Sequence, residues 1–242
     1  MAANPELCSI LDWDGAFFGV TIARVNTNRL DVQTTKLILD WCRDNAVRCL
    51  YLLADSNHFE TLRLAERNGF YLTDIRMTFE HTLPTHSEAG PAIRFALPED
   101  TPVLRAMASS AYQDTRFYYD GHFSQELCSR LYVTWIEKSM NGYAQAVLVT
   151  GDPGQPTGFV TCHTDDATGA GRIGLVGVGE NTRGRGVGQT LIKEALGWFY
   201  RQGMKSVQVS TQGRNIGAQR LYQKCNFLTR EVKFWYHRWF AE

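Results

Sequence analysis

The segment at residues 179–190, GENTRGRGVGQT, constrains this chain more than any other. It is rich in glycine, carries two arginines, and separates a strand-like run, RIGLVGV, from a helix-like run, TLIKEALGWFY. Glycine lets backbone N–H groups turn toward a ligand without a Cβ in the way, and a helix N-terminus adds unpaired donors and partial positive charge. The segment therefore predicts a phosphate-binding turn between a strand and a helix. The alternative is an ordinary glycine-rich turn.

The spacing of the glycines argues against two common phosphate loops. A Walker loop needs a lysine and a metal-binding hydroxyl after its second glycine, but Arg185 and a further glycine follow Gly184. The dinucleotide motif G-x-G-x-x-G fails because Gln189 stands where the third glycine is required. Nucleoside triphosphate hydrolysis and dinucleotide binding are therefore poor explanations of this loop.

Arg183, Gly186 and Gly188 have the spacing R-x-x-G-x-G, which resembles the signature of the GNAT acetyltransferases. In that family the loop holds the pyrophosphate of acetyl-coenzyme A, and backbone groups of the preceding strand bind the coenzyme. The resemblance therefore implies acetyl-coenzyme A as co-substrate, with no metal. It implies these coenzyme contacts: Val176, Gly177, Val178, Arg183, Gly184, Arg185, Gly186, Val187, Gly188 and Asn215.

Composition and charge describe an ordinary globular protein. The chain has 242 residues, 44% of them apolar, and its 25 basic and 25 acidic residues balance. A balanced charge gives no field that would attract nucleic acid. We expect a cytoplasmic protein without membrane insertion, because no signal peptide opens the chain and no apolar run approaches about eighteen residues. The six cysteines form no C-x-x-C pair, which favours reduced thiols over disulfides or a zinc site.

An internal repeat appears when the chain is shifted by 157 residues. Trp41 then falls on Trp198 and Phe70 on Phe227, and the segment RLAERNGF overlays RLYQKCNF. The identities are few, so two unrelated helix–strand–helix units would be an alternative explanation. The shared register favours a duplicated fold.

The first copy lacks the groups that would bind phosphate. Asn26, Arg29 and Asp31 stand opposite the loop residues of the second copy, and Ala65 stands opposite Tyr222. An aspartate at the phosphate position would repel the ligand. We therefore predict that the first copy is a wall or a lid and not a second active site.

These patterns predict an α/β (α+β) chain built as a tandem GNAT-like fold. Residues 1–83 are expected to form a degenerate first unit, 84–91 (PTHSEAGP) a linker, and 92–242 a complete GNAT domain with a mixed, mostly antiparallel sheet. The element order predicted from residue 92 onward matches the family arrangement. In the first unit, residues 16–25 (AFFGVTIARV) predict a strand.

Tyr222 is the candidate general acid for acetyl transfer. A phenol has a pKa of about 10, so it can protonate a departing thiolate, and the family often carries a tyrosine at this position. Packing of the ring alone would also explain Tyr222, and capping of a helix would explain Asn215. The general base stays open, because the strand before the loop has no carboxylate until Glu180. A water relay, a carboxylate of the first copy, or His122 or His163 could act.

Two further segments and the tandem design resemble the acetyltransferases of nucleotide-linked amino sugars. The segments are DWDGAFFGV near the N-terminus and ASSAYQDTRFYYD in the second half. That group has a candidate acidic residue shortly after the Gly-Phe pair of the first half, and Asp74 in GFYLTD matches it. The resemblance makes Asp74 a candidate for handling the acceptor amine, although a solvated strand carboxylate is an equal alternative. It also offers five side chains for contact with a substrate, which could equally be core residues: Phe17, Phe18, Arg116, Tyr118 and Tyr119.

The resemblance implies an N-acetyltransferase acting on a nucleotide-linked deoxy amino sugar of the dTDP-4-amino-4,6-dideoxyhexose type. Direct attack in a ternary complex is expected, because no cysteine accompanies the loop motif. Two alternatives stay open: an acceptor that is an amino acid, polyamine or protein N-terminus, or a protein that senses acetyl-coenzyme A without turnover. Whether the chain forms a homodimer is also open.

Overall fold

The computed structural model describes residues 7–83 and 93–241. The predicted linker at 84–91 lies outside the described residues. In the first half the elements are β1 Cys8–Ile10, α1 Asp12–Phe18, β2 Ile22–Val25, α2 Val32–Asp44, β3 Cys49–Asp55, α3 Phe59–Arg67 and β4 Tyr71–Thr82. In the second half they are β5 Arg94–Phe95, a 3₁₀ turn Pro98–Asp100, α4 Thr101–Ala111, α5 Arg116–Asp120, α6 Gln125–Lys138, a π turn Ser139–Tyr143, β6 Ala146–Asp152, β7 Gln155–Asp165, β8 Ala170–Val178, a 3₁₀ turn Glu180–Thr182, α7 Val187–Arg201, β9 Ser206–Gln212, α8 Ile216–Lys224 and β10 Leu228–Trp239.

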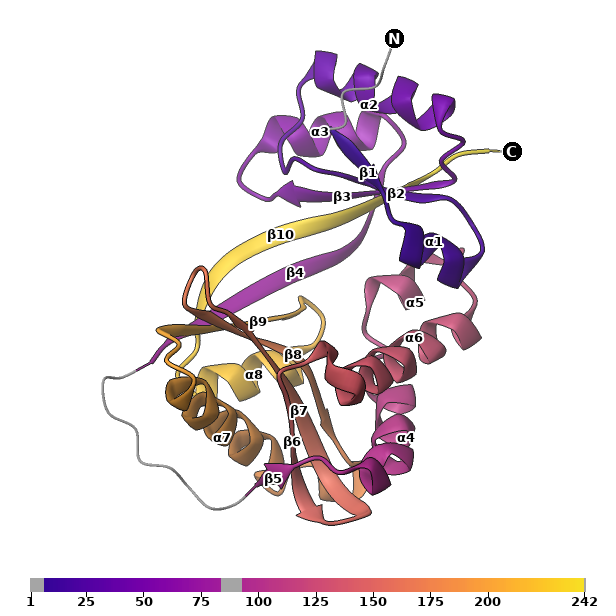
Figure 1. The fold of residues 1–242 in the computed structure, drawn as a ribbon. Coiled ribbons are helices and arrows are strands. Elements are labelled where there is room, and N and C mark those ends of the chain that lie inside the picture. The colour runs from indigo at the N-terminus through magenta and orange to yellow at the C-terminus, as the bar shows by residue number, and fades with distance from the viewer. Residues whose placement is uncertain (1–6, 84–92, 242) are drawn as a thin grey trace.

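The described strands form one sheet in the order β1-β2-β3-β10-β4-β9-β8-β7-β6-β5. Only the pairs β2/β3 and β8/β9 are parallel in this described part of the sheet. The mixed, mostly antiparallel sheet predicted above is therefore confirmed. Helices α7 and α8 cover one face of the second half, and α4 and α6 cover the other (Figure 1).

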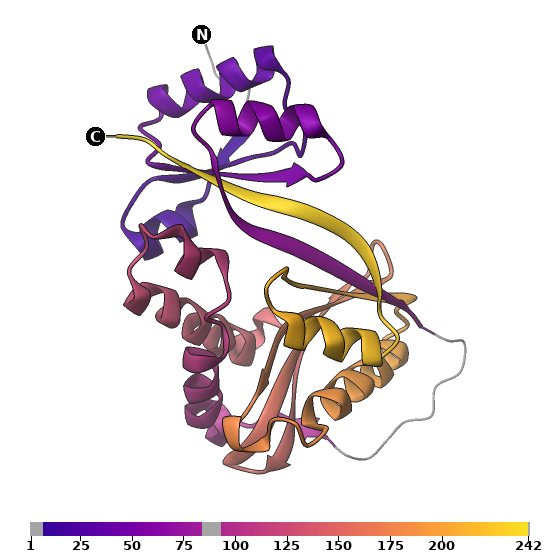
Figure 2. The same ribbon diagram turned by 180° about the vertical axis from the view of Figure 1, so that it is seen from behind.

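The repeat is visible in the order of elements. The series β2-α2-β3-α3-β4 in the first half corresponds to β8-α7-β9-α8-β10 in the second, and each series contains one of the parallel pairs. The last strand of each half crosses to the other half. Strand β4 pairs with β9, β10 pairs with β3, and β4 and β10 pair with each other. Figure 1 and Figure 2 show these two long strands running side by side between the halves.

The predicted strand at residues 16–25 is wrong over its first part. Residues 12–18 form helix α1, which ends at Gly19 with a left-handed φ of 73°, and only 22–25 form a strand. The side chain of Phe18 packs against Phe117 and Phe123 of the second half, with ring centroids 5.4 and 4.3 Å apart. A local pattern could not reveal this helix, because its aromatic residues are buried by a distant segment.

The exchange of strands predicts that the halves do not fold separately. The Tyr236 side chain of β10 is buried among first-half residues such as Leu50 and Leu52. A fragment of residues 92–242 expressed alone would expose the Tyr236 side chain and leave the β9 edge without its partner β4. We expect this fragment to aggregate, and co-expression with residues 1–83 to restore soluble, folded protein. Circular dichroism and size-exclusion chromatography of both preparations would check this; a monomeric, cooperatively unfolding fragment would contradict it.

Candidate active site

A cleft opens where β8 and β9 separate. The two strands pair only from Ala170 to Ile173 of β8, and β8 then continues alone along β7. The β7/β8 pairing shifts register between Val160 and Cys162, and the Leu175 N–H donates to Thr161 Oγ1 at 2.8 Å. This irregularity turns β8 away from β9. The resulting coenzyme cleft has a volume of about 640 Å³ and is lined by β8, the glycine loop, β9 and α8.

The free edge of β8 offers backbone donors to the cleft. The Gly179 N–H donates to the Thr157 carbonyl of β7 at 2.9 Å. Because backbone groups alternate along a strand, the N–H groups of Val178 and Val176 point away from β7. The Val176 carbonyl accepts a hydrogen bond from the Tyr112 hydroxyl at 2.9 Å, on the same side. Of the strand residues predicted to bind coenzyme, these two valines are therefore in position to do so.

Gly177 is required by packing within the protein. By the same alternation its N–H points toward β7, and a Cβ at Gly177 would lie 2.3 Å from the Phe159 ring. Contact between Gly177 and the coenzyme stays a prediction. Gly174, which the sequence did not single out, has a comparable constraint, because a Cβ there would lie 2.7 Å from both His163 Nε2 and Thr161 Oγ1.

The glycine loop has the conformation that an anion cradle needs. Gly184 and Gly186 adopt left-handed φ values of 77° and 84°, with open space where a Cβ would stand. Helix α7 begins at Val187, and no side chain caps its N-terminus. A Cβ at Gly188 would lie 3.1 Å from Leu221. Uncapped N–H groups at a helix start favour a bound phosphate, so the residues fit the diphosphate of acetyl-coenzyme A.

The two arginines of the loop are not among the glycines and helix N–H groups that form the anion cradle. Arg183 and Arg185 are exposed, and Arg183 lines the cleft. The equivalent helix of the first half is α2, and its N-terminus is capped by Asp31, whose carboxylate accepts the Thr34 N–H at 2.7 Å. This contrast supports the prediction that only the second half binds the coenzyme.

Tyr222 lies on α8 and lines the coenzyme cleft. Its ring packs between Phe79 of β4 and Phe227, each with centroids 5.9 Å away. Burial raises the pKa of the Tyr222 phenol, so the group keeps its proton at neutral pH. The N-cap predicted at Asn215 is confirmed, since its side chain accepts the Ala218 N–H at 3.0 Å. The role of Tyr222 as acid stays a prediction.

Tyr112, at the end of α4, was missed by the sequence reasoning. It lines the cleft, bonds to Val176, and stacks on Tyr132 with centroids 4.5 Å apart. Burial, followed by the negative charge of an ionised Tyr222, raises its pKa well above the ordinary value. Its position depends on the packing of α4 against β8, and no local motif marks it.

Asp74 lies on β4 and is 4% exposed. It accepts the Ile75 N–H at 2.8 Å, and Arg214 Nη1 lies 3.4 Å from the same carboxylate oxygen. Burial raises the pKa of Asp74 to about 6, although Arg214 opposes the shift. The carboxylate lines a cavity of about 230 Å³, here called the Asp74 cavity, which borders the coenzyme cleft at Gly174 and Ser210. Asp74 and Tyr222, one from each half, therefore line adjoining spaces.

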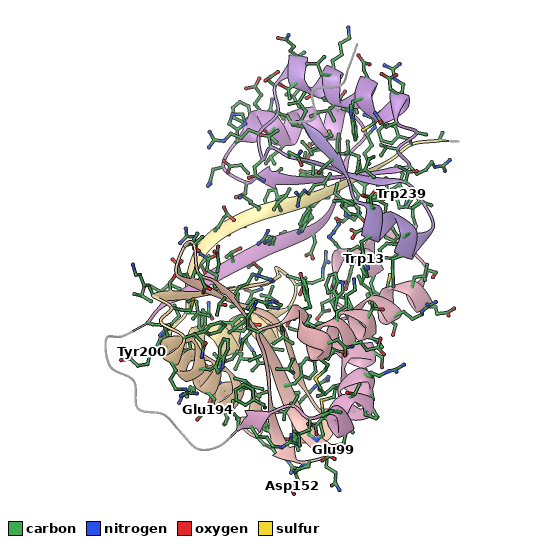
Figure 3. All side chains as sticks on the ribbon, in the orientation of Figure 1. Trp13, Glu99, Asp152, Glu194, Tyr200 and Trp239 are labelled. Carbon is green, nitrogen blue, oxygen red and sulfur yellow. The ribbon has the colours of Figure 1, made fainter. Side chains whose placement is uncertain are left out.

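A third space, here called the Trp13 cavity, lies between α1, α6 and the sheet. Its volume is about 420 Å³, and Trp13 marks it in Figure 3, where α1 approaches the second half. The cavity meets the Asp74 cavity at Arg172 and Gly174, and Gly174 also lines the coenzyme cleft. Its lining residues are Trp13, Asp14, Trp135, Lys138, Ser139, Tyr143, Thr161, His163, Arg172, Gly174 and Leu175.

The predicted substrate aromatics lie outside these three spaces. Phe18 is buried in the core, Phe17 stacks on Trp13 with centroids 5.2 Å apart, and Tyr118 packs against the same core. None of the three lines the cleft or either cavity. Their packing accounts for their presence, and contact with a substrate stays a prediction.

Arg116 and Tyr119 also lie away from the cavity walls. The Arg116 guanidinium stacks on Tyr51, 4.1 Å from the ring centroid, and its Nη1 lies 2.6 Å from His237 Nε2. Tyr119 is 56% exposed, with the Arg214 guanidinium 3.7 Å from its ring centroid. Arg116 therefore contacts other side chains of the protein, and its positive charge is among those that lower the pKa of Asp74.

The two candidate histidine bases differ in their surroundings. Burial, and then the charge of Arg172, lower the pKa of His163 to about 4, so its ring is neutral and weakly basic near pH 7. His122 lies 3.1 Å from Asp120, stacked on Trp239 and outside the three spaces. Within residues 7–83 and 93–241, no three His, Cys, Asp or Glu side chains gather to hold a metal ion. In that same part of the chain, no helix has the length and apolar character to cross a membrane.

Comparison with known proteins agrees with this geometry. The model of the acetyltransferase (GNAT) family matches residues 107–227, which include the loop, the cleft and Tyr222. The chain is 30% identical to the dTDP-fucosamine acetyltransferase of Escherichia coli O6:H1 over 231 residues, covering 94% of this chain and 96% of that protein. It is 24% identical to the spore coat polysaccharide biosynthesis protein SpsD of Bacillus subtilis, covering 67% of this chain and 54% of that protein.

Solved structures share the two-part fold. A GCN5-related N-acetyltransferase from Sphaerobacter thermophilus superposes with a TM-score of 0.67 at 19% identity, covering 96% of this chain and 76% of its own. A tandem GNAT protein from the clavulanic acid biosynthesis pathway has a TM-score of 0.57 at 14% identity, with 93% and 77% covered. The chain belongs to the GNAT family, and it is an acetyl-coenzyme A-dependent N-acetyltransferase.

Proposed function

We propose that the chain transfers acetyl from acetyl-coenzyme A to the amine of a nucleotide-linked deoxy amino sugar of the dTDP-4-amino-4,6-dideoxyhexose type. The observation that carries the proposal is the junction at Gly174, where the coenzyme cleft, the Asp74 cavity and the Trp13 cavity meet. An acceptor with its amine near Asp74 would reach the mouth of the cleft and still have room to extend. The name of the Escherichia coli relative, which covers nearly the whole chain, supports the same acceptor class.

The proposed chemistry needs two groups on opposite sides of the reacting carbonyl. Asp74 holds the acceptor ammonium and passes its proton to water, which leaves a neutral amine. The amine nitrogen forms the new bond to the acetyl carbon while the bond from carbon to sulfur breaks, and the nitrogen then releases its surplus proton to water. Tyr222 gives its proton to the departing thiolate and takes one back from water after the transfer. The backbone N–H groups of Val176 and Val178 orient the thioester, which supplies the activated acetyl group.

The pKa of Asp74 predicts the acid limb of the pH profile. Because its pKa is about 6, the carboxylate is lost as the pH falls through 6, and kcat/KM for the acceptor should fall with it. Asp74→Asn should lower kcat/KM for the acceptor by about 10²-fold and remove this limb. Steady-state kinetics from pH 5 to pH 8 would measure both. The KM for acetyl-coenzyme A should not change.

Asp44→Asn is a matched control, because Asp44 is an exposed first-half carboxylate at the end of α2. It should behave as the unmodified protein. Unaltered kinetics and an intact acid limb in Asp74→Asn would remove this carboxylate from the mechanism and favour a water relay.

A screen of acceptors tests the proposed function directly. Thiol release from acetyl-coenzyme A would be followed with dTDP-linked and UDP-linked amino sugars, free amino sugars, amino acids, polyamines and a peptide amine. The proposal expects turnover with a nucleotide-linked amino sugar at least about 10²-fold faster than with the other amines, because binding energy of the remote nucleotide is used in the transition state. Faster turnover of an amino acid, polyamine or peptide, or none with any amine, would contradict it.

A further inference from the structure

Polar side chains form a row across the sheet face opposite α7. His163 of β7, Arg172 of β8 and Gln208 of β9 are register partners on neighbouring strands, so their side chains share a face. On β4 the register partner of Gln208 is Glu80, which accepts a hydrogen bond from Gln208 Nε2 at 2.9 Å; further along the same face, Arg76 Nε lies 3.2 Å from Ser210 Oγ of β9. The row therefore crosses from the second half into the strand that the first half contributes.

Arg172 occupies the centre of this row. It lines both the Asp74 cavity and the Trp13 cavity, beside Gly174 at the mouth of the coenzyme cleft. A ligand whose amine lies at Asp74 must pass Arg172 to enter the Trp13 cavity. The Asp74 cavity has a volume of about 230 Å³ and the Trp13 cavity a volume of about 420 Å³. For a ligand whose amine lies at Asp74, the larger space is therefore on the far side of Arg172.

The cations around this junction are not held in close ion pairs within the described residues, although Glu231 acts on Arg76 and Asp14 on Lys138 from a longer distance. Across the described ranges, no carboxylate lies within 4 Å of Arg172, Arg76 or Lys138. Lys138 instead places Nζ 3.8 Å from the Trp13 ring centroid. Arg94, away from the junction, is by contrast held in an ion pair, with its Nη1 2.7 Å from Asp100 Oδ2.

The one carboxylate in the Trp13 cavity does not neutralise this charge. Burial raises the pKa of Asp14, and the cations Arg116, Arg24 and Lys138 oppose that shift without forming an ion pair within 4 Å. Asp74 lines the same cavity as Arg172 and Arg76, but in the proposed function it is engaged by the acceptor ammonium. The three cations are then left to face a negatively charged part of the ligand, and they would repel a polyamine. They suit a ligand group with two or more negative charges.

We infer that Arg172 binds the diphosphate of the nucleotide-linked acceptor, flanked by Arg76 and Lys138, with the base in the Trp13 cavity. This inference rests on the proposed function, since it assumes that the amine lies at Asp74. The planar guanidinium binds two phosphate oxygens at once, which a lysine cannot do. The aromatic side chains of Trp13, Trp135 and Tyr143 line the cavity that the base would enter and give it surfaces for stacking.

The test is the affinity for thymidine 5′-diphosphate, measured by titration calorimetry on the full chain. Saturating coenzyme A is present throughout, so that the nucleotide cannot occupy the coenzyme cleft. Arg172→Gln should weaken binding by about 10- to 100-fold, the loss typical of charge-assisted hydrogen bonds. Arg172→Lys should lose less, because it keeps the charge. Arg130→Gln, which changes an exposed arginine of α6 outside all three spaces, should bind as the unmodified protein does.

Two further readouts separate this inference from a structural effect and from the proposed function. In Arg172→Gln the KM for a dTDP-linked amino sugar should rise, while the KM for acetyl-coenzyme A should not change. Equal affinity of the unmodified protein and Arg172→Gln for thymidine 5′-diphosphate would overturn the inference, and turnover of nucleotide-linked amino sugars would then leave the proposed function standing. If the unmodified protein neither binds the diphosphate nor acetylates any nucleotide-linked amine, both fail.

Discussion

Gly186→Glu is expected to abolish coenzyme A binding in a chain that still folds. Gly186 is the N-cap of α7, with a left-handed φ of 84° and open space where its Cβ would stand. A glutamate there would direct a negative charge at the uncapped N–H groups of the helix and occupy the phosphate position, as Asp31 closes α2 in the first half. Loss of two charge-assisted hydrogen bonds predicts at least about 100-fold weaker binding. Calorimetric titration with coenzyme A measures this.

Gly203→Glu controls for the backbone strain that any side chain suffers at positive φ. Gly203 follows the same helix, with a φ of 75° and no atom within 4 Å of its Cβ position. It should lose comparable stability and keep its affinity for coenzyme A. Full affinity in a folded Gly186→Glu protein would show that the diphosphate is bound elsewhere. Neither variant should bind a nucleoside triphosphate at the loop.

Tyr222→Phe is expected to lower kcat by about 10²- to 10⁴-fold, the range for loss of a general acid. The substitution keeps the ring between Phe79 and Phe227 and removes only the hydroxyl. Because burial raises the pKa of the phenol, the proton is present throughout the neutral range, and the loss should hardly depend on pH between 6 and 8. Rapid-quench measurement of the first turnover separates this step from product release.

The matched control is Tyr236→Phe, which removes the hydroxyl of another buried tyrosine. Its hydroxyl donates to Glu66 in the first half, 3.2 Å away, and it lines none of the three spaces. It should keep full turnover. Full turnover in Tyr222→Phe would mean that water, or Tyr112 beside it, protonates the thiolate. The double variant Tyr112→Phe/Tyr222→Phe would then distinguish these two sources.

Features that depend on neighbours along the chain could be predicted from the sequence. The glycine spacing at 179–190 is local, because the φ values of Gly184 and Gly186 and the start of α7 involve consecutive residues. The N-cap at Asn215 is also local, since the N–H group that donates to its side chain belongs to Ala218, three residues away. The 157-residue repeat anticipated the matching order of elements and the mixed sheet, because a repeated hydrophobic pattern buries the same faces in both copies.

Features that depend on contacts between distant segments could not be predicted. No pattern in Tyr71–Thr82 indicates that β4 pairs with β9 of the other half, yet this pairing brings Asp74 to the cleft at Ser210. The same applies to Tyr112 under β8 and to Arg172 between its two cavities. The aromatic runs at Phe17 and Tyr118 stay ambiguous for the converse reason, since large apolar side chains serve a core and a ligand site equally well.

The sequence by itself thus determined the family, the coenzyme loop and the candidate acid, because each of these is encoded within one short stretch of chain. The tertiary structure alone decided which residues line the Asp74 cavity and the Trp13 cavity. The exchanged strands β4 and β10 and helix α1 bring first-half residues against the second half. The physical reason is that both cavities are assembled by packing across the two halves, where sequence separation carries no information about distance.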